Sequence, residues 1–94
     1  MLRIDHLGIA VSDLGQARSF YELLGMEAGP EEVIEHEQVR TVMIPAGESR
    51  IELLEPTSPD SVIGRFIDRH GEGIHHVTCA RRPALRWNVT EAGP

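Results

Sequence analysis

Apolar and polar positions alternate along several short stretches of the chain, and two other stretches show helical spacing. The alternation predicts strands at residues 2–11, 38–44, 49–54 and 74–79, and a weaker strand at 26–34. Apolar residues three or four positions apart predict one helix capped by Asp13 and a second helix capped by Ser58. Gly25 and Gly71 are expected to end these helices. The tail is harder to interpret, and residues 84–89 are predicted as a short helix.

The order of these elements is strand, helix, three strands, a linking helix and then a strand like the first. We expect an α+β fold in one domain, residues 1–94. Residues 1–56 would form a βαβββ unit with a mixed, curved sheet, and residues 57–94 the linking helix and the beginning of a second, incomplete unit. Such a unit leaves an open sheet edge, which favours pairing with another copy. We therefore expect a homodimer.

Two strands repeat each other, and each carries a histidine at the same place. Ile4 corresponds to Ile74 and His6 to His76, at one constant offset. Glu52 lies in a third strand, with apolar neighbours. A single strand histidine more often makes a structural hydrogen bond than a metal bond, but the repeat favours ligands. All three residues lie opposite the face assigned to helix packing, so they should share one concavity. Two imidazoles and a carboxylate suit a divalent metal.

Composition and charge narrow the range of partners. The formal net charge of −6 argues against nucleic acid and against an anionic membrane surface. The single cysteine, Cys79, excludes an internal disulfide and fits a reducing compartment. No apolar run approaches the roughly 18 residues of a membrane span. We therefore expect a soluble, cytoplasmic protein.

Several segments resemble the methylmalonyl-CoA epimerases. These enzymes are a branch of the vicinal oxygen chelate superfamily, together with glyoxalase I and bleomycin-resistance proteins. The resemblance is carried by residues 4–14, 20–21, 24–26, 51–56, 58–61 and 71–77. The first segment is general to the superfamily, whereas 51–56 and 71–77 are closer to the epimerase branch.

The resemblance implies a metal centre and a reaction. It places metal ligands on His6, Glu52 and His76, with cobalt, manganese, nickel or zinc as the cation. It implies an acyl-CoA thioester substrate and interconversion of (R)- and (S)-methylmalonyl-CoA through a metal-stabilised enolate. The fourth family ligand is a glutamate on the last strand of the second unit, which the 94 residues do not include, so we expect impaired catalysis. The resemblance implies glutamates as the acid and base, one of them on that last strand; no acid in these 94 residues is assigned the role, and Glu37 and Glu48 are expected to be solvated.

Two other interpretations use the same residues. Another metalloenzyme of the superfamily, such as a glyoxalase (lactoylglutathione lyase) or a dioxygenase, would carry the same three ligands. A non-catalytic remnant or binding module is the third interpretation, because the fourth ligand is missing from the sequence. A substrate panel separates the first two, and tight metal binding counts against the third.

Overall fold

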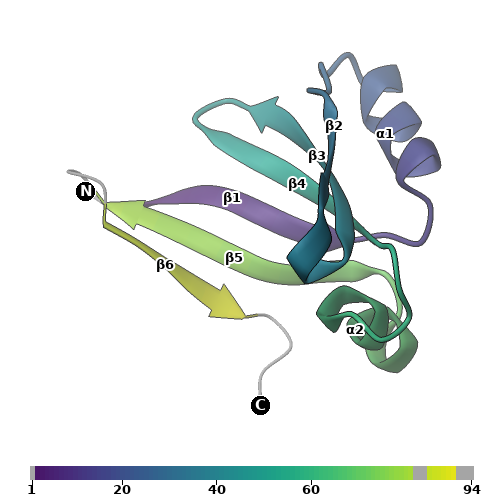
Figure 1. Cartoon of the computed structure of the whole chain (residues 1–94). Helices are drawn as coiled ribbons and strands as arrows, with labels where there is room; N and C mark the ends of the chain where they lie inside the picture. Colours follow the sequence, from purple (N-terminus) through teal and green to yellow (C-terminus); the bar gives the residue numbers. More distant parts are fainter. Residues whose placement is uncertain (1, 82–84, 91–94) are drawn as a thin grey trace.

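One mixed sheet of six strands forms the body of the protein, and both helices lie toward the same end of it (Figure 1). The computed structural model describes residues 2–81 and 85–90. The elements are β1 (Leu2–Ala10), α1 (Leu14–Leu23), β2 (Glu31–Ile34), the 3-10 turn η1 (Glu35–Glu37), β3 (Val39–Ala46), β4 (Ser49–Pro56), α2 (Val62–His70), β5 (Gly73–Arg81) and β6 (Leu85–Thr90).

The strand order places β1 next to both β4 and β5. The sheet runs β2-β3-β4-β1-β5-β6, with β1 parallel to β4 and antiparallel to β5. The other neighbouring pairs are antiparallel. The predicted α+β fold with a βαβββ unit and a mixed sheet is therefore confirmed. The topology brings the two histidine-bearing strands side by side, with the Glu52 strand on the other side of β1.

The two faces of the sheet carry separate apolar clusters. Helix α1 packs over one face, where Leu14, Val42 and Leu53 are buried. Helix α2 packs over the opposite face, where Ile63 meets Ala10 and other apolar residues. Since Glu52 alternates with Leu53 along β4, it lies on the α2 face. The expectation that the candidate ligands lie away from helix packing therefore holds for α1 only, because α2 covers one end of their face.

The helix starts agree with the sequence in one case and differ in the other. Asp13 caps α1 as predicted, and its Oδ1 accepts a hydrogen bond from the Gln16 N–H at 3.0 Å. The prediction for α2 is wrong by one turn. Ser61, not Ser58, is the cap, because the Ser58 carbonyl accepts hydrogen bonds from Ser61 in a preceding turn. Val62 then begins the helix and is 69% exposed.

The predicted helix at residues 84–89 is wrong over the part that the structure describes. Residues Leu85–Thr90 form β6, which pairs antiparallel with β5 from Arg81↔Leu85 to His76↔Thr90. Trp87, Val89 and Thr90 are residue types that favour strands, and the free edge of β5 offers them backbone partners. The sheet is therefore one strand wider than the sequence predicted.

Candidate metal centre

Three adjacent strands bring the predicted ligands together on one face of the sheet. His6 comes from β1, Glu52 from β4 and His76 from β5. The register explains their meeting, because Gly8 of β1 is paired with Glu52 on one side and with His76 on the other. The position between these two side chains is thus occupied by a glycine, and His6, two residues earlier on the same face, completes the group.

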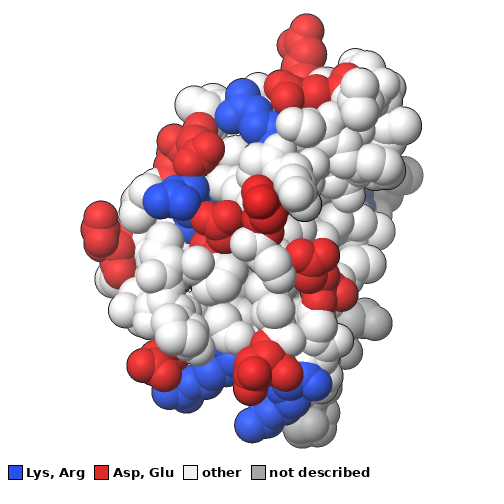
Figure 2. All heavy atoms as spheres, turned by 90° about the vertical axis from the view of Figure 1, so that its right-hand side faces the viewer, with Lys and Arg blue, Asp and Glu red and all other residues white. Residues whose placement is uncertain are grey.

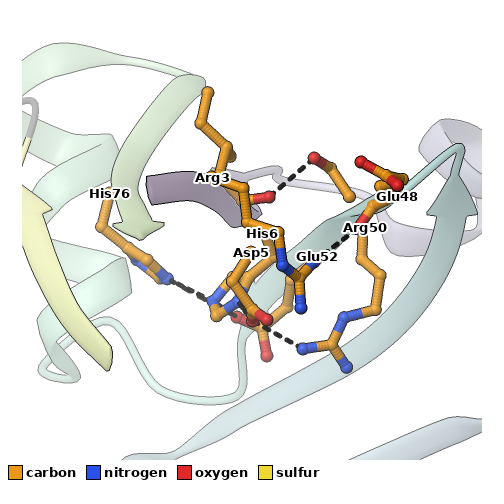
Figure 3. Close-up of polar contacts among 9 residues, drawn as sticks. Arg3, Asp5, His6, Glu48, Arg50, Glu52 and His76 are labelled. Atoms are coloured by element: carbon orange, nitrogen blue, oxygen red, sulfur yellow. Dashed lines mark hydrogen bonds and ion pairs between the residues drawn. The ribbon is translucent and has the colours of Figure 1, made fainter. Parts of the chain in front are cut away.

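The ligand atoms form a small and nearly equilateral triangle. The Nε2 atoms of His6 and His76 are 3.3 Å apart, and each lies 3.6 Å from Glu52 Oε1 (Figure 3 shows the three side chains converging). Donors bound to one metal at about 2.1 Å stand roughly 3.0–3.4 Å apart in octahedral or tetrahedral geometry. The side chains are about one-sixth exposed, which leaves access for further ligands. The donor set fits a divalent cation.

Gly8 makes room for the His76 ring. A Cβ at Gly8 would stand 2.2 Å from Cε1 and 2.4 Å from Nε2 of His76. Carbon atoms in contact are normally about 3.5–4.0 Å apart, so any side chain at this position would displace the imidazole. The glycine is therefore required by close approach of a ring, not by its backbone conformation.

Asp5 and His75, which contact the two histidines, were not recognised from the sequence as parts of the site. Regular alternation would place Asp5 on the face opposite His6, but Asp5 is 3% exposed and its Oδ2 lies 2.9 Å from His6 Nδ1. Arg50 Nη2 donates to the same oxygen at 2.7 Å. On β5, His75 Nδ1 lies 2.9 Å from His76 Nδ1. Register shifts in the β1–β5 pairing cause both arrangements, and strict alternation cannot reveal them.

The surroundings of His75 favour its neutral form. Burial lowers the pKa of His75, and the nearby imidazole of His76 lowers it further. The ring also packs edge-on against Phe66 of α2, with centroids 5.0 Å apart. A neutral His75 can accept or donate one hydrogen bond at Nδ1, depending on its tautomer.

A cleft of about 760 Å³ opens above the three ligands. Its size is in the range of small-molecule sites. The sheet supplies the floor, η1 with the neighbouring ends of β2 and β3 supplies one wall, and the start of α2 supplies another. Glu37 and Asp60 are the lining carboxylates outside the trio, among the residues that the structure describes. Glu48 is not among these lining residues; it is near the other end of β1, where its carbonyl accepts a hydrogen bond from Arg3.

The sequence model of the Glyoxalase/Bleomycin resistance protein/Dioxygenase superfamily matches residues 5–86. The chain belongs to this superfamily. The match covers β1 through the start of β6, and so includes every residue of the candidate metal centre. Members of this superfamily, also known as vicinal oxygen chelate proteins, bind divalent metals, which agrees with the donor set found here.

Within the superfamily, the chain is similar to epimerases and to a protein of unassigned activity. It is 41% identical over 78 residues to the uncharacterized protein YqjC of Bacillus subtilis, covering 82% of the chain and 56% of that protein. It is 38% identical over 77 residues to the mitochondrial methylmalonyl-CoA epimerase of Bos taurus, covering 80% and 44%. The chain thus spans about half the length of these relatives.

A solved relative shows the same fold with a ligand. The structure of a Streptomyces coelicolor methylmalonyl-CoA epimerase variant in complex with 2-nitronate-propionyl-CoA superposes with a TM-score of 0.73 at 40% identity. The alignment covers 80% of the chain and 57% of that protein.

The surface charges bear on nucleic-acid binding, and the two helices bear on membrane insertion. On the face shown in Figure 2, acidic side chains are widely spread and the basic ones lie beside them, without forming a continuous basic surface. Neither α1 nor α2 is long and apolar enough to cross a membrane.

Proposed function

We propose that this chain carries the metal centre of an epimerase that acts on a methylmalonyl-CoA-type thioester. The observation that carries the proposal is the triangle of His6, Glu52 and His76 at the floor of a cleft. The similarity to epimerases supports the choice of this reaction within the superfamily. The substrate class comes from the Streptomyces relative, whose complex contains an acyl-CoA analogue.

His6, Glu52 and His76 would hold the cation. A divalent cation supplies Lewis-acid polarisation of substrate oxygens, which makes the neighbouring carbon–hydrogen bond more acidic. Glu52 supports this role, because it is largely buried and its ion-pair contacts within the described residues are with the two imidazoles alone. Burying a carboxylate destabilises the folded state unless a nearby positive charge compensates its negative charge.

Epimerisation also needs a group that removes a proton and another that returns one on the opposite face of the carbon. Glu37 is our candidate for one of these groups, because it lines the cleft without belonging to the trio. Gln38, the next residue, has a φ of 54° and is the one non-glycine residue with positive φ in residues 2–81 and 85–90. Backbone strain of this kind is often retained where it fixes a functional side chain. Asp60 is the second candidate from the lining.

The test is isotope exchange at the substrate carbon. The chain, loaded in turn with cobalt, manganese, nickel or zinc, is incubated with methylmalonyl-CoA in D2O, and deuterium at the α-carbon is followed by mass spectrometry. We expect exchange that His76→Ala abolishes and His70→Ala leaves unchanged, since His70 is exposed on α2 and outside the cleft lining. Glu37→Gln should lower the rate by about 10²–10⁴-fold if it is the acid or base.

Two results would refute the proposal. One is exchange that survives His76→Ala; the other is no exchange with any cation, with turnover of glyoxalase or dioxygenase substrates in the same assay. Metal binding without turnover of any substrate would favour the non-catalytic interpretation. The homodimer, the cytoplasmic location and the division at residue 56 stay predictions.

A further inference from the structure

The β1–β5 pairing contains two register shifts at equivalent places. Pairing passes from Ile4↔Cys79 to His6↔Thr78, which makes Asp5 the extra residue of a bulge on β1. It passes from Gly8↔His76 to Ile9↔Ile74, which makes His75 the extra residue of a bulge on β5. Asp5 and His75 are related by the same offset as His6 and His76. Each bulge therefore falls directly before a candidate ligand.

A bulge changes which side chains share a face. In a regular strand, consecutive side chains point to opposite faces, whereas a bulge interrupts this alternation and redirects a side chain. Here the redirected side chain reaches the Nδ1 atom of the following histidine, at 2.9 Å in both cases. The Nε2 atoms of the same two rings face each other and Glu52. Each imidazole thus has one nitrogen in the trio and the other against a neighbour in sequence.

This arrangement constrains the proton on each ring. A neutral imidazole carries one N–H, and a nitrogen that binds a metal must be the other one. The Asp5 carboxylate is held by Arg50 at 2.7 Å, and it accepts the hydrogen bond that the Nδ1–H form of His6 donates. The His75–His76 contact joins two Nδ1 atoms, so one ring donates and the other accepts. Nε2 of His76 is left for a cation only if His76 is the donor.

We propose that Asp5 and His75 are positioning residues that hold the proton of His6 and of His76 on Nδ1, leaving both Nε2 atoms as ligands. This inference rests on the proposed metal centre and concerns the cation-bound protein, because without a cation the 3.3 Å contact between the two Nε2 atoms requires a proton on one of them. Groups behind ligand histidines raise metal affinity by fixing ring orientation and tautomer, and their removal typically costs 10–100-fold.

The first experiment measures the tautomers directly. Two-bond ¹H–¹⁵N correlation spectra of histidine-labelled, zinc-loaded protein distinguish a protonated Nδ1 from a protonated Nε2 at each ring. We expect Nδ1–H at His6 and at His76 in the wild type. Asp5→Leu should remove this preference at His6, and Asp5→Asn, whose carboxamide oxygen can still accept, should retain it. Asp68→Ala, which removes a carboxylate from the exposed face of α2, is the charge control and should change neither ring.

The second experiment measures cobalt affinity by calorimetry. We expect a loss of 10–100-fold in Asp5→Leu, a smaller loss in Asp5→Asn, and unchanged affinity in Asp68→Ala. For the second bulge, His75→Phe should weaken cobalt binding and His75→Asn, which restores an acceptor near Nδ1, should recover part of it. If Asp5→Leu does not fold, the His75 pair and the wild-type spectrum still decide the matter.

The outcomes separate this inference from the proposed function. An Nε2–H tautomer at His6 or His76 in the zinc-loaded wild type would overturn the positioning role, whatever the metal affinity. Equal affinity of Asp5→Leu, Asp5→Asn and the wild type would also overturn it. Failure of the wild type to bind cobalt, nickel, manganese or zinc would instead remove the proposed metal centre, and that outcome is read from the wild type alone, without any substitution at Asp5 or His75.

Discussion

The contact between Gly8 and His76 gives a quantitative test of the metal centre. In Gly8→Ala, the new Cβ would lie 2.2–2.6 Å from three atoms of the His76 ring. Ordinary contacts of about 3.5 Å or more require the ring to withdraw by about 1 Å. Metal–ligand distances tolerate deviations of about 0.2 Å, so His76 Nε2 would leave the ligand set. We expect cobalt affinity to fall by at least the 10–100-fold typical of disturbed outer contacts, or about 1.4–2.7 kcal/mol.

The assay separates this local effect from misfolding. Cobalt binding is measured by calorimetry, and urea unfolding of the metal-free protein gives its free energy of unfolding. Gly8 lies in a strand without positive φ, so alanine is compatible with the backbone and the fold should persist. Gly15→Ala is the control, because its Cβ would stand 3.4 Å from Asp13 Oδ1, the nearest atom, and cobalt affinity should not change. A folded Gly8→Ala protein with wild-type affinity would refute the assignment of His76 as a ligand.

Three further predictions concern the scaffold, each measured by urea unfolding of the metal-free protein. Leu53→Ala should lower the free energy of unfolding by about 2–5 kcal/mol, because Leu53 is fully buried beneath α1; a loss below 1 kcal/mol would contradict the packing described. Glu55→Gln should cost about 1–3 kcal/mol, because its carboxylate accepts from the Leu14 N–H at 2.9 Å and from Arg40 at 2.8 Å; equal stability would show that the start of α1 does not depend on Glu55. Gly71→Ala should cost about 1–2 kcal/mol, because Gly71 ends α2 at a φ of 79°; no loss would show that the cap relaxes without strain.

The sequence was most informative where regular alternation and repetition coincide. Alternation along β4 placed Glu52 opposite Leu53, and the repeat paired His6 with His76, so the trio could be predicted before any coordinates. Asp5 and His75 were missed because a bulge inserts a residue and reverses the alternation locally. The sequence of either strand alone does not show this reversal, because it arises from their pairing.

Two errors arose from local signals that compete. Residues 58–61 contain two serines, each a good helix cap, and the first is followed by a proline suited to a helix start. The structure uses Ser61, whose Oγ accepts from the Gly64 N–H at 2.9 Å. In residues 85–90 the helical spacing of apolar residues is weak, and backbone pairing with the free edge of β5 favours a strand. The position of the α2 cap and the strand at residues 85–90 both depend on contacts that form only in the folded chain.

The position of β1 between β4 and β5 has a consequence for how the protein folds. The three candidate ligands lie far apart in sequence but on adjacent strands, so one bound cation would act as a cross-link between them. Such a ligand stabilises the folded state by about 2.7 kcal/mol at a concentration 100 times its Kd. For a domain of this size that corresponds to a rise in Tm of roughly 10–20 °C. Metal supply would then raise the stability of the folded protein before any substrate is encountered.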